Sequence, residues 1–406
     1  MLERLEPQSP DALLALIKLH AADPRGDKID LGVGVYRTEE GATPVFAAIK
    51  DAEQRLIDDQ DSKSYLGPEG DMGFVNALMP WIFGEDATMG GRIAGMQTPG
   101  GTGAVRLAAA LAQKAGMKRL HMGVPSWPNH AQILGDLGLE IAPFDHASAD
   151  GTADIDAVLG AIRSAGADEG VLLHGCCHNP TGIDYTPEEW AQIADAFEIS
   201  GAFPIIDTAY QGLGRGLEED AAGLRMVLAK VPEAFIAYSC DKNFGMYRDR
   251  VGAFYILSDG KETLDRAFSN ANALARASWS MPPDHGAAAV RLILRDNALT
   301  QMWQDELDAM RARMRQVRDR LAAAGMAGSV DLAPLGRQNG LFSMLPVTKE
   351  QVASLREDHA IYMAGSGRIN VAGLTMGNID RFIDAIAEVT GKEPPRGIHQ
   401  VSDIIR

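Results

Sequence analysis

The sequence predicts an α/β protein in which a large domain, built on a mostly parallel sheet covered by helices, is joined to a smaller α+β domain. Three observations support this fold class. Short apolar runs alternate with longer amphipathic stretches between Gly100 and Ser258, which is the rhythm of a parallel sheet with helical crossovers. The alternation fades after Gly260. The length of 406 residues also exceeds that of a single small core.

The strands of the large domain are expected where short apolar runs are bounded by polar or turn-forming residues. These runs are Val171–His174, Phe203–Asp207, Ala234–Ser239 and Val251–Leu257. Amphipathic helices are expected between them, at Pro187–Ile199, where Thr186 is a suitable N-cap, and at Ala221–Lys230.

One long amphipathic helix is predicted at Leu299–Ala324, with apolar residues at helical spacing. These residues are Met302, Leu307, Met310, Met314, Val317 and Leu321. Beyond it, strands are expected at Gly340–Leu345 and Arg368–Val371, and a helix at Asn378–Thr390. We therefore expect an N-terminal arm that completes the small domain (1–40), a large domain that runs into the long helix (41–310), and a small C-terminal domain (311–406).

The composition excludes several classes of function. A formal net charge of -17 repels phosphate backbones and anionic lipids, and no basic cluster offsets it, so we expect neither nucleic-acid nor membrane binding. No apolar run approaches the roughly 20 residues that span a bilayer. The first ten residues include Glu3, Arg4 and Glu6, unlike a secretory signal. Three cysteines argue against a disulfide framework, so a cytoplasmic location is expected.

Two candidate motifs lie where predicted strands end, which is where open α/β sheets bind their ligands. Gly100–Ala104 precedes the helical run Val105–Ala115, and backbone N–H groups at such a helix start can hold a phosphate. Asp207 ends an apolar strand, and Tyr210 follows shortly after. Taken alone, each motif is more often an ordinary turn.

The third candidate is Lys242, in the segment Ser239–Gly245, with Arg248 and Arg250 just beyond. A single lysine is usually a solvated surface charge. In a partly desolvated pocket near other cations, however, the ammonium form is disfavoured, which suits an amine that must form a Schiff base.

Other conspicuous residues have a structural interpretation when taken singly. Asn179–Gly182 is typical of a turn, Trp127 of a core aromatic residue, and His130 of an interior histidine. Cys176-Cys177-His178 suggests a metal site, but adjacent cysteines lack the Cys-x-x-Cys spacing and no second ligand pair appears. We expect no metal.

In their order along the chain, these motifs resemble those of the class I aminotransferases, in the branch that acts on aspartate and aromatic amino acids. The motifs are Gly-Gly-Thr-Gly at 100–103, Trp127, Asn179-Pro-Thr-Gly, Asp207 with Tyr210, Lys242 with Arg250, and Gly367-Arg368-Ile369-Asn370. The resemblance extends from Leu31 to Gly373, and His174–Gly182 is especially similar to the bacterial members. It implies the fold-type-I architecture with a seven-stranded sheet.

The resemblance also implies pyridoxal 5′-phosphate as cofactor. Lys242 would bind it covalently as a Schiff base and later shuttle the substrate proton. Asp207, oriented by His130, would pair with the protonated pyridine nitrogen. Tyr210 and Asn179 would hydrogen-bond the phenolic oxygen, and Trp127 would stack on the ring. The phosphate would be held by Gly101, Thr102, Ser239 and Arg250.

Family members are homodimers with shared sites, so Tyr65 would reach the partner's cofactor phosphate. Arg368 would bind the α-carboxylate of every substrate, in a site that Gly34, Trp127 and Asn179 also line. Arg276 would enter the partner's pocket and meet the side-chain carboxylate of a dicarboxylic substrate.

Four positions depart from the family pattern. Asp241 stands where relatives usually carry a small hydroxyl residue, and a carboxylate near the phosphate would weaken cofactor binding unless it points away. Ser278 and Met281, near Arg276, replace asparagines that are common in aspartate-restricted relatives, and Ser64 replaces another frequent asparagine. These changes favour a pocket of broad range.

The predicted activity is therefore transfer of the amino group between phenylalanine, tyrosine, tryptophan or aspartate and 2-oxoglutarate, in two half-reactions through pyridoxamine phosphate. The principal alternative is a dedicated aspartate aminotransferase. Other carbanion chemistry on the same cofactor, such as β-decarboxylation or a lyase reaction, and a cofactor-bound regulatory protein are remoter alternatives.

Overall fold

The computed structural model describes residues 1–7, 12–86 and 88–391, and the chain divides into two compact units. The large unit is Pro44–Arg313. The small unit combines Met1–Thr43 with the described residues from Met314 onward. The sequence places the corresponding boundaries at residues 40 and 310. The long helix α11 (Asn297–Ala324) contributes residues to both units.

The large unit contains a seven-stranded sheet in the order β2-β8-β7-β6-β5-β3-β4. Its strands are β2 (Ile93–Pro99), β3 (Arg119–Val124), β4 (Glu140–Asp145), β5 (Glu169–His174), β6 (Phe203–Thr208), β7 (Glu233–Ser239) and β8 (Val251–Ser258). Strand β8 runs antiparallel to β2 and β7, and the other neighbouring pairs are parallel. The middle residues of the central strands are apolar because both faces of the sheet are covered. The predicted mostly parallel sheet is confirmed.

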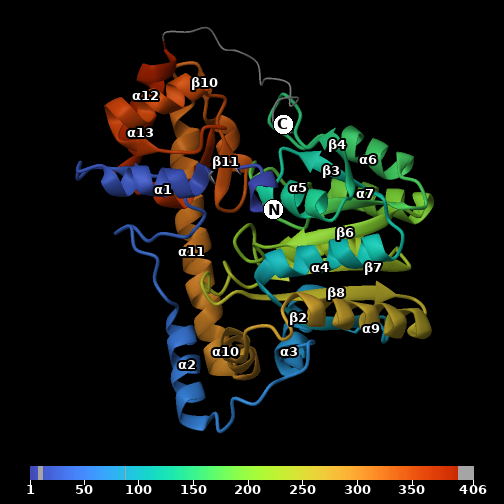
Figure 1. Ribbon diagram of the computed structural model, residues 1–406. Helices are drawn as coiled ribbons and strands as arrows, with labels where there is room; N and C mark the ends of the chain where they lie inside the picture. Colours follow the sequence, from blue (N-terminus) through green and yellow to red (C-terminus); the bar gives the residue numbers. More distant parts are fainter. Residues whose placement is uncertain (8–11, 87, 392–406) are drawn as a thin grey trace. The chain divides into compact units, whose positions relative to one another are not determined.

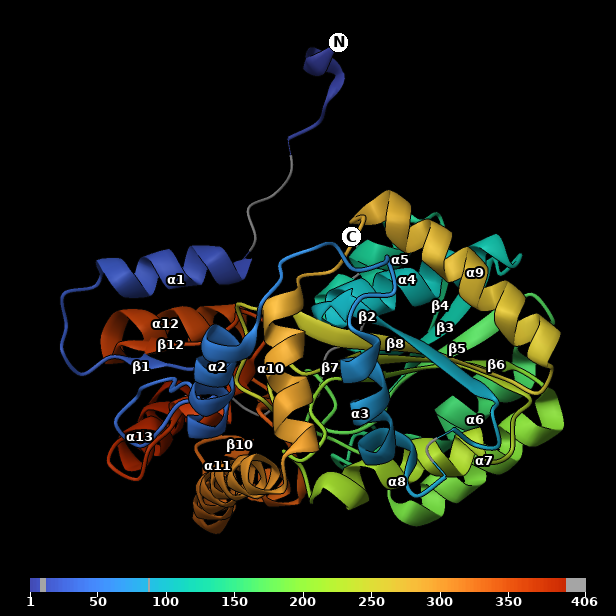
Figure 2. The same cartoon turned by 90° about the horizontal axis from the view of Figure 1, so that it is seen from below.

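Helices cover both faces of this sheet (Figures 1 and 2). The helices of the large unit are α2 (Ala47–Asp59), α3 (Met72–Phe83), α4 (Gly100–Lys114), α5 (Pro128–Asp136), α6 (Ile155–Ser164), α7 (Pro187–Ser200), α8 (Leu217–Leu228), α9 (Lys261–Ser278) and α10 (Asp284–Arg295), of which α2 packs on α10. Figure 2 shows α4 and α9 on one face and α6, α7 and α8 on the other. Buried side chains between α4, α9 and the sheet form a hydrophobic core, including Ala108, Leu111, Phe254 and Ile256.

The helix starts follow local capping chemistry. Thr186 and Glu189 form the reciprocal capping box that begins α7 one residue later, at Pro187. Helix α8 begins at Leu217, earlier than the predicted Ala221, because acidic residues in its first turn are favourable at the positive helix end. Helix α4 begins at Gly100 instead of Val105, so the glycine motif is itself the first turn of the helix.

The small unit joins the two ends of the chain, because β1 pairs in parallel with β12 and places Ile29 opposite Ile361. Strands β9 and β10 pair antiparallel, as do β11 and β13. The elements are η1 (Leu2–Arg4), α1 (Ala12–Ala22), β1 (Ile29–Asp30), β9 (Met326–Ala327), β10 (Val330–Asp331), η2 (Ala333–Arg337), β11 (Phe342–Met344), α12 (Lys349–His359), β12 (Ile361–Tyr362), β13 (Arg368–Asn370), η3 (Val371–Gly373) and α13 (Ile379–Thr390). Leu321 and Phe382 belong to its buried core. Within the described parts of the chain, none of the helices has the length and apolar character required to cross a bilayer.

Candidate active site

The large unit gathers the predicted cofactor residues along one edge of its sheet. Strands β2, β3, β5, β6 and β7 all run in the same direction and end there, and β8 starts there. The register places His174 opposite Asp207 and Ser239 opposite Gly252. At this edge lie Asp207 and Ser239, at the ends of β6 and β7, and Gly101 and Thr102, in the first turn of α4. The loops that leave it carry Trp127, Asn179, Tyr210, Lys242 and Arg250. This is the edge at which parallel sheets bind ligands.

Lys242 lies in the turn between β7 and β8, and its side chain is half-buried. Its Nζ lies 5.2 Å from the centroid of the Tyr210 ring. Burial lowers the pKa of Lys242, and Arg250 adds to the shift, while the carboxylates of Asp241 and Asp207 oppose it. The neutral, nucleophilic form of the amine is therefore more accessible than in an exposed lysine. The sequence suggested both desolvation and neighbouring cations, and of these burial is the larger cause, while Arg248 is exposed.

A buried contact that the sequence did not reveal holds the Lys242 turn in place. Trp303 on α11 donates from its Nε1 to the Asn243 carbonyl at 2.7 Å and stacks on Phe244, with ring centroids 4.5 Å apart. The Asn243 side chain donates to the Tyr238 hydroxyl at 3.0 Å. The segment on both sides of the lysine is thus fixed by hydrogen bonds and ring stacking, which positions the amine.

Asp207 ends a chain of hydrogen bonds that runs away from the lysine. Its carboxylate lies 2.9 Å from His130 Nε2. On the other side of that ring, Nδ1 lies 2.9 Å from the Ser126 hydroxyl, which is also 3.1 Å from His174 Nε2. Asp207 and His130 are buried, so the orientation of the carboxylate is tightly constrained. Ser126 and His174 were not singled out from the sequence, although both lie at strand ends beside predicted residues.

Three histidines continue this array into the interior. The ring centroid of His174 lies 4.2 Å from that of His178, and His178 stacks on His146 at 3.5 Å with an interplanar angle of 8°. Burial lowers the pKa of His146 to about 4, and it lowers the pKa values of His174 and His178 well below 6.5. The rings are therefore neutral near pH 7, which permits their close stacking.

This burial predicts a specific loss of stability in acid. An unfolded chain protonates His146 near pH 6.5, whereas the folded chain resists protonation down to about pH 4, so the free energy of unfolding falls as the pH drops through that window. The expected loss from His146 is about 3 kcal/mol. Chemical unfolding of H146N at a series of pH values should show an acid loss smaller by that amount. H285N, at an exposed histidine, is the control, and equal acid losses in H146N and the unmodified protein would refute the prediction.

The residues assigned to the cofactor ring converge above this array. The Asn179 amide donates to the Tyr210 hydroxyl at 3.5 Å. The buried Asn179 Oδ1 has no hydrogen-bond partner in the described parts of the chain, so it is available to a bound group. Trp127 is partly buried and meets His130 edge to face, with ring centroids 5.1 Å apart. These residues fit a flat, polar heteroaromatic ring.

A phosphate-binding site fits at the start of α4. No side chain caps this helix, so its first N–H groups are open to an anion. A Cβ on Gly101 would lie 2.8 Å from the Ser239 Cβ, so only glycine allows α4 to approach the Ser239 hydroxyl so closely. Arg250, just before β8, lies beside Gly100 and contacts the Asp241 carboxylate. A helix start, a hydroxyl and a guanidinium are together typical of phosphate sites.

Tyr65 and Arg276 lie on two segments that run side by side. The Leu66 N–H donates to the Met281 sulfur at 3.0 Å, and a Cβ on Gly70 would lie 2.7 Å from Pro282. The Tyr65 side chain is 94% exposed. Arg276 is exposed as well, at the end of α9, where its guanidinium donates to the Ser280 hydroxyl.

The predicted carboxylate-binding residues lie in the small unit. Arg368 donates to the Gly32 carbonyl at 2.9 Å, and its guanidinium lies 4.6 Å from the centroid of the Phe342 ring. A Cβ on Gly34 would lie 2.7 Å from the tip of the same ring, so glycine is required there. Asn370 donates to the carbonyls on both sides of Gly34, at 2.6 and 2.7 Å, which fixes this segment.

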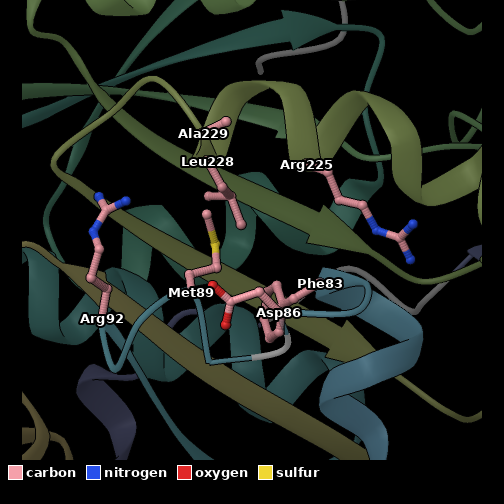
Figure 3. Close-up of a pocket in the computed structure, with 7 residues that line it drawn as sticks. All are labelled: Phe83, Asp86, Met89, Arg92, Arg225, Leu228 and Ala229. Atoms are coloured by element: carbon pink, nitrogen blue, oxygen red, sulfur yellow. The ribbon is translucent and has the colours of Figure 1, made fainter.

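Two other features of the large unit, a cysteine pair and a surface pocket, resemble binding sites. The Cys176 and Cys177 sulfurs and an Asp220 oxygen lie within 4.8 Å of one another. The Asp220 carboxylate, however, already accepts three backbone N–H groups, which would repel a cation, and no metal remains our expectation. A surface pocket of about 420 Å³ contains none of the predicted site residues (Figure 3). Its two arginines, Arg92 and Arg225, are already engaged by backbone carbonyls and carboxylates.

Comparisons with known proteins agree with this geometry. Residues 26–386 match the family model for aminotransferases of class I and II. The chain is 47% identical over 393 residues to a tyrosine aminotransferase of Rhizobium meliloti, covering 97% of this chain and 99% of that protein. It is 42% identical to an aspartate aminotransferase of Escherichia coli, covering 96% and 100% of the two chains.

Solved structures show the same likeness. An aromatic amino acid aminotransferase with 3-indolebutyric acid is 41% identical and superposes with a TM-score of 0.90, over 96% of this chain and 100% of the other. The aromatic-amino-acid aminotransferase of Burkholderia pseudomallei, covalently bound to pyridoxal phosphate, is 34% identical, with a TM-score of 0.91 over 96% and 99% of the chains.

Proposed function

Because this chain belongs to the class I and II aminotransferase family, we propose that Lys242 would hold pyridoxal 5′-phosphate through its amine and release it to the amine of an incoming substrate. The chain is a transaminase, and amino acids and 2-oxo acids are its substrates. One observation carries the proposal: a half-buried amine, the His130-bound Asp207 carboxylate and the Asn179–Tyr210 pair lie at one edge of one sheet.

Bound pyridoxal phosphate would supply an aldehyde for the amino group and a ring that delocalises the electrons left when the α-proton departs. Asp207 would pair with the ring nitrogen of the bound cofactor, and His130, 2.9 Å away, would hold the carboxylate in place for this role. Tyr210 and Asn179 would hydrogen-bond the phenolic oxygen. Lys242 Nζ would serve as the base for the proton on the substrate α-carbon, a task that needs an amine with a lowered pKa.

We propose that the substrates are aromatic L-amino acids and aspartate, with 2-oxoglutarate as acceptor. Arg368 would bind the α-carboxylate through its two-pronged guanidinium. Arg276 would meet a second carboxylate where the substrate has one. Its present partner is the hydroxyl of Ser280, and Met281 nearby is apolar and adaptable. A guanidinium held at the surface by a hydroxyl can turn to solvent when an aromatic side chain binds, which avoids burying an unpaired charge.

Replacement of Arg276 should separate the two substrate classes. In R276A we expect kcat/KM for aspartate to fall about 10²-fold, since a hydrogen-bonded charge pair is lost, while kcat/KM for phenylalanine changes less than about threefold. The matched control is R266A, which removes an exposed arginine of the same helix that pairs with Glu262. Equal losses for both substrates would refute the role of Arg276. If the protein were a dedicated aspartate aminotransferase, the unmodified protein would have negligible activity with phenylalanine.

We propose a homodimer in which Tyr65 and Arg276 serve the partner's site. The supporting observation is that both are exposed on adjoining segments, beside Leu66, whose apolar side chain is exposed as well. Activity should therefore decline at dilutions at which sedimentation shows only monomer. Full activity of the monomer would contradict the shared site. The cytoplasmic location stays a prediction.

The direct test of the proposed function is the absorbance of the purified, cofactor-loaded protein on addition of aspartate and, separately, phenylalanine. Conversion of the cofactor to its amine form with both amino acids, reversed by 2-oxoglutarate, is expected. A spectrum that changes with neither amino acid would contradict the proposal, and a response to aspartate alone would favour the dedicated aspartate enzyme.

A further inference from the structure

The Asp241 carboxylate points into the group of residues that would hold the cofactor phosphate. The side chain is 2% exposed. Its Oδ2 contacts Arg250 Nη1, and its Oδ1 accepts the Val251 N–H at 3.1 Å. The Asp241 N–H in turn donates to the Ser239 hydroxyl at 3.2 Å. Two of the side chains expected to grip the phosphate, Arg250 and Ser239, are thus both bonded to Asp241.

The same carboxylate lies against the first residue of α4. A Cβ on Gly100 would lie 2.6 Å from Arg250 Nη2 and 3.0 Å from Asp241 Oδ2. The positive end of α4 and the Arg250 guanidinium are therefore close to an anion that belongs to the chain itself. A phosphate group bound at this position would have to share the helix end and the guanidinium with the Asp241 carboxylate.

We propose that Asp241 is an internal competitor of the cofactor phosphate, which lowers the affinity of the site for phosphate by occupying Arg250. The inference rests on the proposed function, in which this site holds pyridoxal phosphate. Like charges that share one guanidinium repel each other strongly where solvent is partly excluded. The protein should consequently exchange its cofactor more readily than if a neutral residue preceded Lys242.

Protonation of Asp241 would relieve the competition. Burial raises the pKa of Asp241, and the cations that face it, Lys242 and Arg250, oppose that shift. The buried Cys240 thiol is a further titratable neighbour, while β8 presents the Val251 N–H to the carboxylate and α4 presents the backbone of Gly100. Phosphate binding should thus be accompanied by proton uptake, and it should weaken as the pH rises and Asp241 ionises fully.

The test compares cofactor-free protein with the D241S and D241N variants. Calorimetric titration with inorganic phosphate should show about tenfold tighter binding in both variants. The affinity for pyridoxal phosphate, measured by fluorescence quenching, should rise by a similar factor in both variants. The affinity for pyridoxal, which lacks the phosphate, should not change. The control variant is D249S. It removes a carboxylate that is near Asp241 in the sequence but has no part in the proposed phosphate site. The rise in the phosphate dissociation constant with pH should be steeper in the unmodified protein than in D241S.

The inference is overturned if D241S and D241N bind phosphate no more tightly than the unmodified protein. It is also overturned if D249S binds phosphate about tenfold more tightly. The asparagine variant keeps the side-chain volume, so it remains informative if D241S does not fold. If pyridoxal phosphate binds and is joined to Lys242 while the affinities stay equal, only the competition is wrong. If no variant binds pyridoxal phosphate or inorganic phosphate, the proposed function fails as well.

Discussion

Replacement of Lys242 by alanine should lower the transamination rate by about 10⁴-fold or more. The variant loses both the amine that would hold the cofactor and the base that removes the α-proton. Binding of pyridoxal phosphate should persist, because the start of α4, Ser239 and Arg250 are unchanged. Single-turnover kinetics with aspartate and phenylalanine provide the measurement.

Two further variants make the result for Lys242 specific. K242R keeps a positive charge but has no neutral amine near pH 7, so it should be as inactive as K242A. K261A removes an exposed lysine that pairs with Asp265, and it should behave like the unmodified protein. Retention of more than a hundredth of the activity in K242A would remove Lys242 from the chemistry.

The second large effect is expected from Asp207. The asparagine variant D207N keeps the shape of the side chain and can still hydrogen-bond His130, but it lacks the charge that would hold a proton on the ring nitrogen. Loss of such a preorganised charge in a buried site costs about 10² to 10³-fold in kcat. D207E, which retains the charge, should keep more activity than D207N.

A variant of His130 separates the effect of the charge of Asp207 from the effect of its orientation. In H130N the Asp207 side chain is kept but loses the bond at 2.9 Å that orients it, so a smaller loss than in D207N is expected. A D207N variant as active as H130N, with an unchanged spectrum of the bound cofactor, would show that the carboxylate is not the partner of the ring.

The parts of the fold that follow from local chemistry could be predicted from the sequence. The apolar runs at β5, β6, β7 and β8 mark strands because each is covered on both faces, and Thr186 marks the start of α7. The start of α4 was placed too late, since a glycine-rich segment has low helix propensity but here begins the helix at Gly100. Tertiary packing against Ser239 decides that position.

The residues of the candidate site were identified by their order along the chain, but their supports were not. Trp303 lies on α11 far from Lys242 in sequence, and only the folded chain brings its Nε1 to the Asn243 carbonyl. Long-range contacts of this kind leave no periodic signal. The direction of the Asp241 carboxylate likewise depends on the conformation of Arg250, which the sequence does not encode locally.

The central claim concerns a single covalent bond, and it can be tested by chemical reduction of the cofactor-loaded protein with borohydride, followed by proteolysis and mass spectrometry. We expect a stable phosphopyridoxyl group on the peptide that contains Lys242, in an amount close to one per chain. Recovery of that peptide unmodified, or of the group on a different lysine, would contradict the account.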